Sequence, residues 1–102
     1  MAVSQDLATL KAIARRLLGP HDVTVYLFGS QALQAARRAS DIDLAVEPGA
    51  RFPDRALADF REAIEESDIV RRVDVVDLRD TAQSFRNRVR REGKLWIGAR
   101  KN

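Results

Sequence analysis

One short segment constrains this chain more than any other, a run of apolar and β-branched residues that ends on a glycine. Val23–Phe28 has the sequence VTVYLF and is followed directly by Gly29 and Ser30. The run is too apolar for a strand with one face in water, so we expect it in the interior of a sheet. Glycine at its end permits a sharp turn and lets a ligand approach the backbone closely. The sequence therefore predicts a buried strand that leads into a ligand-binding turn.

Segments with helical and strand patterns alternate along the chain. Apolar residues at helical spacing follow Ser4 and Thr81, which we expect to be the N-caps of the first and last helices. One small mixed sheet flanked by helices, an α/β (α+β) fold, is the natural way to bury the apolar stripes. The expected helices are residues 4–18, 30–38, 53–66 and 81–92; the expected strands are residues 23–28, 42–47 and 73–78, with 95–97 as a short strand or a segment docked on the core.

The length and composition favour one small globular domain. With 102 residues, of which 45% are hydrophobic and 32% charged, we expect a single folded domain over residues 1–102. The absence of cysteine excludes disulfides and thiolate metal sites. The apolar runs are too short to span a membrane and no signal peptide is visible, so we expect a cytoplasmic protein.

Positive charge is concentrated near the C-terminus. The formal net charge is +3, and arginine and lysine crowd the segment from Arg86 to Lys101. Such a stretch suits contact with nucleic acid, an acidic partner or nucleotide phosphates. A solvated helix face is the alternative, and the composition alone leaves these possibilities open.

Two aspartates flank one apolar residue at the start of the second expected strand. Asp41 and Asp43 are two positions apart, so their side chains leave the strand on the same side, about 6.6 Å apart. Like charges on an apolar strand are costly unless a cation neutralises them. Carboxylate oxygens are hard ligands, so we predict that this pair binds Mg²⁺. Pairing with Arg37 or Arg38 is the structural alternative.

The third expected strand supplies further carboxylates. Asp74 and Asp77 are three positions apart and therefore point to opposite faces of the strand. We expect Asp74 to lie beside the metal pair, as a third ligand or as the general base for an attacking hydroxyl. Asp77, at the end of the strand, is expected to cap a loop.

Gly29 and Ser30 have the properties of a phosphate-binding turn. Backbone N–H groups at the start of a helix attract anions, and the Ser30 hydroxyl adds one more donor. A simple helix cap is the alternative for Ser30. We expect structural roles for three other conspicuous residues: His21 in a turn, Tyr26 in the core and Trp96 as an apolar anchor for the C-terminus.

The combination of Gly29-Ser30, ten residues, and Asp41-Ile42-Asp43 resembles the signature of the minimal nucleotidyltransferases, small members of the DNA polymerase beta-like superfamily. The similarity extends to the strand of Asp74, which matches the family's third aspartate. The resemblance implies a nucleotidyltransferase fold in which Gly29 and Ser30 hold the phosphates of a nucleoside triphosphate. It also implies that Asp41, Asp43 and Asp74 are catalytic and bind Mg²⁺, with two ions expected.

The resemblance also implies a reaction and a partner. Family members transfer a nucleoside monophosphate, most often AMP from ATP, to a hydroxyl, and pyrophosphate leaves. Members of this size are typically encoded beside a HEPN-domain protein that resembles an RNase toxin, and they act as its antitoxin by modifying and binding it. Many members carry an arginine and a glycine where this chain has Leu33 and Gln34.

Two other activities remain open from the sequence. The chain could be a non-catalytic module that neutralises its partner by contact through the basic C-terminal segment. It could instead transfer a nucleotide to an RNA 3′ end or to a small-molecule hydroxyl. Because 102 residues leave no room for an acceptor-binding domain, we expect another molecule to supply the hydroxyl.

Overall fold

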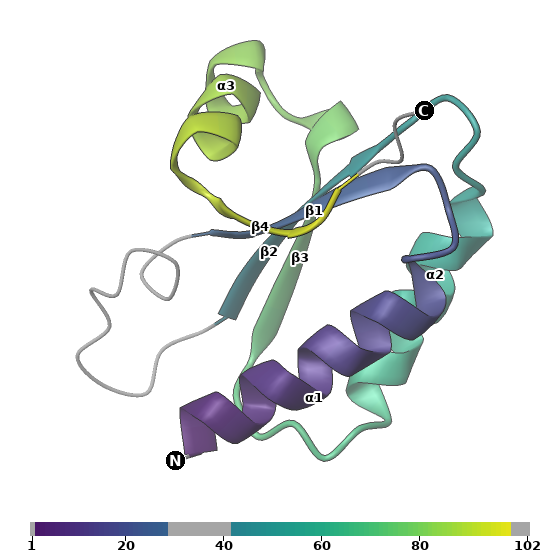
Figure 1. Cartoon of the computed structure of the whole chain (residues 1–102), viewed down its shortest axis with the longest axis vertical. Coiled ribbons are helices and arrows are strands. Elements are labelled where there is room, and N and C mark those ends of the chain that lie inside the picture. Colours follow the sequence, from purple (N-terminus) through teal and green to yellow (C-terminus); the bar gives the residue numbers. More distant parts are fainter. Residues whose placement is uncertain (1, 29–41, 99–102) are drawn as a thin grey trace.

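The computed structural model describes residues 2–28 and 42–98 and shows a sheet between two helical layers. Helices α1 and α2 lie side by side on one face of the sheet, and α3 covers part of the other face (Figure 1). The elements are α1 (Ala2–Leu17), β1 (Val23–Phe28), β2 (Ile42–Pro48), α2 (Asp54–Glu65), β3 (Val73–Asp77), a single 3₁₀ turn η1 (Leu78–Asp80), α3 (Gln83–Glu92) and β4 (Lys94–Ile97).

The four strands form one mixed sheet in the order β3-β2-β1-β4. Strand β1 is antiparallel to both of its neighbours, β2 and β4, whereas β2 and β3 are parallel. The parallel pair requires a crossover, which α2 provides. The prediction of a small mixed sheet flanked by helices, with Val23–Phe28 in its interior, is confirmed.

The face of the sheet beneath α1 and α2 carries the main core. Alternate residues of β1 and β2 point into it, as the period of two in a strand requires. Fully buried side chains from both helices meet them there. This core includes Leu10, Ala14 and Leu18, Val23, Val25 and Leu27, Ile42, Leu44 and Val46, and Phe60.

The opposite face has a smaller apolar cluster beneath α3. Ala45, Leu78 and Val89 are its buried members. Four further side chains pack around them but remain partly exposed. These are Tyr26, Phe28, Val76 and Phe85.

Two expected helix caps are wrong. Helix α1 begins at Ala2, because neither Ala2 nor Val3 interrupts a helix, so Ser4 lies inside the first turn. The N-cap of α3 is Ala82, and the Thr81 hydroxyl instead donates to the carbonyl of Leu78, which closes η1. The expected helix over residues 30–38 lies outside the described residues. The alternative of a short strand at residues 95–97 is confirmed as β4.

Within residues 2–28 and 42–98, we find no helix that combines the length and the apolar character needed to cross a membrane.

Candidate functional site

Two aspartates lie next to each other on the α3 face of the sheet. Asp43 on β2 is the register partner of Asp74 on β3 and of Phe28 on β1. Neighbouring strands are about 4.8 Å apart, so this register brings the two carboxylates side by side. Their strand neighbours Leu44 and Val75 pack on the main core, which leaves the aspartates on the other face. The structure therefore brings together two of the three carboxylates that the sequence suggested.

These aspartates line a cavity of 340 Å³ at the end of the sheet where β1 stops and β2 begins. Two aromatic rings, Phe28 and Phe85, form part of the wall, with their centroids 5.5 Å apart and an edge-to-face angle of 78°. The cavity thus combines an acidic side with an aromatic side. The remaining lining residues are Leu44, Ala45, Val75 and Val76.

Only part of the predicted site falls within the described residues. Gly29, Ser30 and Asp41 lie outside them. No group of three or more histidine, cysteine or acidic side chains that could hold a metal occurs in the described ranges. Asp43 and Asp74 nevertheless provide adjacent hard oxygen ligands of the kind that Mg²⁺ prefers. Asp74 is partly solvated and lies 3.4 Å from Nε of the exposed Arg72.

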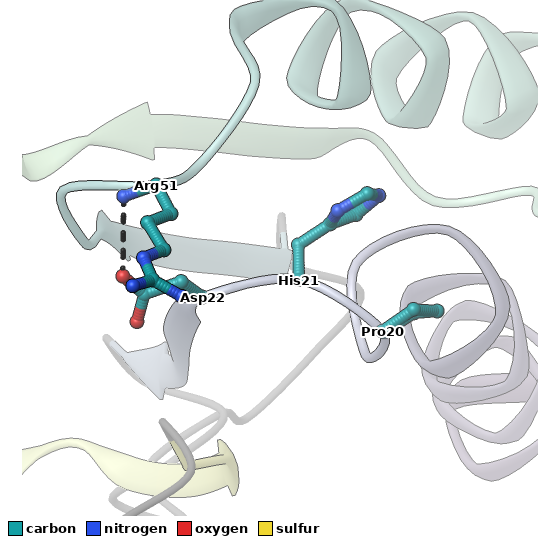
Figure 2. Close-up of a pocket in the computed structure, with 4 residues that line it drawn as sticks. All are labelled: Pro20, His21, Asp22 and Arg51. Atoms are coloured by element: carbon teal, nitrogen blue, oxygen red, sulfur yellow. Dashed lines mark hydrogen bonds between the residues drawn. The ribbon is translucent and has the colours of Figure 1, made fainter.

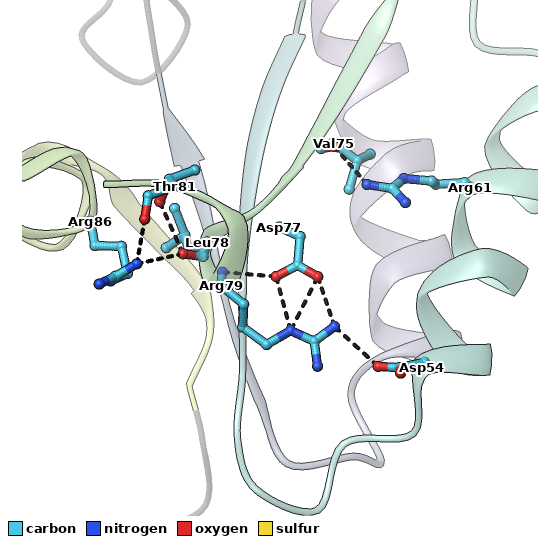
Figure 3. A network of polar contacts seen from close by, with 8 residues as sticks. All are labelled: Asp54, Arg61, Val75, Asp77, Leu78, Arg79, Thr81 and Arg86. Atoms are coloured by element: carbon cyan, nitrogen blue, oxygen red, sulfur yellow. Dashed lines mark hydrogen bonds and ion pairs between the residues drawn. The ribbon is translucent and has the colours of Figure 1, made fainter. Parts of the chain in front are cut away.

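Asp77 points to the opposite face and has a structural partner. Its carboxylate accepts hydrogen bonds from the backbone N–H and the guanidinium of Arg79, which also lies 3.0 Å from a carboxylate oxygen of Asp54 (Figure 3). The hydrogen bonds and charge of Arg79 hold the pKa of Asp77 below its ordinary value. The prediction that Asp77 caps a loop is confirmed, because it is the N-cap of η1.

A second polar contact ties α3 to the sheet away from the cavity. Glu47 of β2 accepts hydrogen bonds from Arg90 of α3 and, at 3.4 Å, from the Tyr26 hydroxyl. The bond to Arg90 lowers the pKa of Glu47, whereas burial, followed by the charge of Glu47, raises the pKa of Tyr26. Tyr26 is therefore a partly buried packing residue, as expected, and Trp96 likewise packs against the main core.

Another cavity, of 460 Å³, lies at the far end of the β1–β2 pair (Figure 2). Pro20, His21, Asp22 and Arg51 line it. The Asp22 carboxylate accepts the backbone N–H of Arg51 at 3.2 Å, and its carbonyl accepts the N–H of Gly49 at 2.8 Å.

Contacts around this second cavity belong to a turn. A Cβ at Gly49 would come within 2.2 Å of the Asp22 carboxylate, so the turn depends on glycine there. The His21 ring packs edge-to-face on Phe52, with centroids 6.0 Å apart. His21 is therefore a turn residue, as expected, and the Asp22 carboxylate in this cavity already binds the backbone of the turn.

Sequence reasoning missed the aromatic wall. Phe85 lies 57 positions after Phe28, and nothing in either segment indicates that their rings meet. The one available signal was that Phe28 directly precedes Gly29, the first residue of the predicted phosphate turn, in the sequence.

Comparisons with known proteins agree on one family. The family model described as "Polymerase beta, Nucleotidyltransferase" matches residues 10–102. A curated relative from Haemophilus influenzae, named "Probable protein adenylyltransferase MntA", is 36% identical over 88 residues, which is 86% of this chain and 75% of the relative.

Two solved structures extend the similarity to the fold. One, assigned as a minimal nucleotidyltransferase, matches with a TM-score of 0.69 and 32% identity over 91% of this chain and 94% of its own length. The other is a crystal structure of a toxin–antitoxin with AMP-PNP. It matches with a TM-score of 0.63 and 28% identity over 88% of this chain and 74% of that chain.

Proposed function

We propose that this chain, which belongs to the Polymerase beta nucleotidyltransferase family, transfers AMP from ATP to a hydroxyl of a partner protein. The observation that carries the proposal is the pairing of Asp43 with Asp74 on the wall of a 340 Å³ cavity. The curated relative is named for protein adenylyl transfer, and the solved toxin–antitoxin relative holds an ATP analogue. The name of the curated relative supports a protein as the acceptor, and the solved relative supports ATP as the nucleotide.

The carboxylates would serve as metal ligands and as a proton acceptor. Asp41, Asp43 and Asp74 would hold Mg²⁺, which supplies charge neutralisation for the triphosphate and for the oxygen that attacks it. The acceptor oxygen forms a bond to the α-phosphorus as the bond to pyrophosphate breaks. Asp74, beside Asp43 and partly solvated, would take the proton of the acceptor hydroxyl at its carboxylate.

Gly29 and Ser30 would bind the phosphates from the adjoining turn. They directly follow Phe28, whose ring lines the cavity. Backbone N–H groups and a serine hydroxyl at this point would face the same space as the two aspartates and orient the triphosphate toward them. This assignment depends on the sequence signature and on the position of Phe28.

The proposed acceptor is a HEPN-type toxin, and the chain would be its antitoxin. The family resemblance implies the HEPN type of the partner, and the solved toxin–antitoxin relative supports a toxin as that partner. The chain would act as one domain, and the acceptor hydroxyl would come from the partner. The AMP group, transferred in a Mg²⁺-dependent reaction, would then block the activity of the toxin.

The test is a transfer assay with isotopically labelled ATP, Mg²⁺ and the protein encoded beside this chain. We expect label on the partner with the wild-type chain and none with Asp41→Asn, Asp43→Asn or Asp74→Asn. Asp80→Asn is a matched control, because it removes the same charge from an exposed turn and should leave transfer intact. Label that persists in the three site variants would contradict the proposal.

The same assay separates the alternatives. Neutralisation of the partner by Asp43→Asn without label would favour a non-catalytic antitoxin that acts by contact. Label on an added RNA 3′ end or on a small alcohol, and none on the protein, would favour those acceptors instead.

A further inference from the structure

Three arginines occupy alternate positions of α3, and two of them hold the helix on the sheet. Arg86 donates to the carbonyls of Leu78 and Thr81 (Figure 3), and Arg90 pairs with Glu47. Both guanidinium groups are therefore committed to structural contacts.

The third arginine, Arg88, has a different environment. Its Cζ lies 5.8 Å from the centroid of the Phe28 ring, and its Nε donates to Glu92 at 3.2 Å. Among the described residues, neither of its terminal nitrogens is hydrogen-bonded, and 57% of the side chain is exposed. The group is therefore held by an aromatic face while most of its donors remain available.

Arg88 lies at the rim of the cavity described above. Phe28, beneath its guanidinium, lines that cavity and is the register partner of Asp43. Phe85, one turn earlier on the same side of α3, lines it as well. A cation thus lies across the aromatic wall from the two aspartates.

We propose that Arg88 binds a phosphate group of the nucleotide at this rim, an inference that rests on the proposed function. A guanidinium that lies over an aromatic ring is attracted to the ring face and keeps its N–H groups as donors for other acceptors. Phosphate oxygens accept such bonds in pairs, with a gain from the opposite charges. A polyanionic triphosphate next to two aspartates also needs positive charge that the metal alone does not fully supply.

The test is calorimetric titration of the full chain with AMP-PNP in the presence of Mg²⁺. We expect Arg88→Gln to weaken binding about ten- to a hundredfold, as for the loss of one charge-assisted bidentate contact. Arg88→Lys should give an intermediate value, because lysine keeps the charge without the planar pair of donors. Binding of adenosine, which lacks phosphate, should not change in either variant.

Arg91→Gln is the matched control. It removes the same charge from the same helix, at a side chain that is 67% exposed and 3.7 Å from the same Glu92. AMP-PNP affinity should stay within about twofold of wild type. Glu92→Gln should strengthen binding about two- to fivefold, because it removes the carboxylate that competes for Arg88.

Equal AMP-PNP affinities in Arg88→Gln and Arg91→Gln would overturn this role for Arg88, as would an equal loss of adenosine binding. A specific loss of AMP-PNP binding, in a chain that never labels its partner, would uphold the phosphate contact. That same result would refute the proposed transfer, so the two failures are distinguishable.

Discussion

The two faces of the sheet differ in burial and in polarity. We call the face beneath α1 and α2 the closed face and the face beneath α3 the open face. Beneath α1 and α2, side chains such as Leu10 and Phe60 are completely buried, and the strands contribute only apolar residues to the core. Beneath α3, the same strands present Asp43 and Asp74 beside partly exposed aromatic rings. Among the described residues, α3 covers part of this side, whereas α1 and α2 lie together on the other side (Figure 1).

This difference separates stability from chemistry. Alternation along a strand lets Leu44 stabilise the core while its neighbour Asp43 faces a cavity. Because the closed face supplies most of the buried apolar area, the open face can hold adjacent like charges that would weaken a packed core. Substitutions on the open face should therefore lower activity with little loss of stability. Substitutions on the closed face should mainly lower stability.

The largest effect should come from Asp74→Asn on the open face. AMP transfer should fall by about a thousandfold or more, because a metal ligand and proton acceptor is lost. The free energy of unfolding should change by less than about 1 kcal/mol, because the exposed contact with Arg72 is weak and repulsion by Asp43 disappears. Labelled transfer and urea unfolding measure the two quantities. A large loss of stability would show that the faces are not separable.

On the closed face, Phe60→Ala should destabilise the chain by about 3–5 kcal/mol, because it leaves a cavity in a fully buried site. Phe85→Ala, on the open face, should cost only about 1–2 kcal/mol, since that ring is partly exposed. Urea unfolding of both variants gives the comparison. Equal losses would mean that the two faces contribute alike to stability.

A smaller effect concerns acid stability on the closed face. Arg79 depresses the pKa of Asp77, so the folded state releases this proton more readily than the unfolded state. The resulting stabilisation is present above about pH 4, the ordinary value for aspartate, and is lost as the pH falls through the depressed pKa. Asp77→Asn should therefore lose less stability than wild type between pH 6 and about pH 3.

Unfolding curves at a series of pH values test this contribution. Arg79→Gln should flatten the acid dependence in the same way, because it removes the partner that lowers the pKa. Some dependence should remain in both variants, since Glu47 has its own lowered pKa. An unchanged slope in both variants would show that the Asp77–Arg79 contact does not couple stability to pH.

The smallest effect should come from Tyr26→Phe. Its hydroxyl makes one long hydrogen bond to Glu47 at the end of the open face away from the cavity. Loss of that bond should cost about 0.5–1 kcal/mol in unfolding free energy and leave AMP transfer unchanged. A loss of transfer would mean that this end of the face also takes part in the reaction.

The sequence predicted the sheet and the face of Asp74 because both follow from local patterns. The apolar character of VTVYLF indicates an interior strand, and the three-residue spacing of Asp74 and Asp77 places their side chains on opposite faces of a strand. The parallel partnership of β2 and β3 then brings Asp43 to Asp74.

What the sequence could not predict depends on contacts between distant segments. The rings of Phe28 and Phe85, and the guanidinium of Arg88, come together only when α3 packs on β1. The caps at Ser4 and Thr81 were wrong for a related reason. Cap preference is a weak local signal. Helix α1 begins at Ala2, before the expected cap Ser4. The expected cap Thr81 closes η1 instead, so α3 is capped by Ala82.

The most direct test of the account is an NMR titration of the isotopically labelled chain with AMP-PNP and Mg²⁺. We predict that the amide signals of Phe28, Asp43, Asp74 and Phe85 shift, while those around Phe60 on the closed face do not. Signals that shift instead around His21 and Arg51, at the cavity of Figure 2, would contradict the assignment of the open face as the nucleotide site.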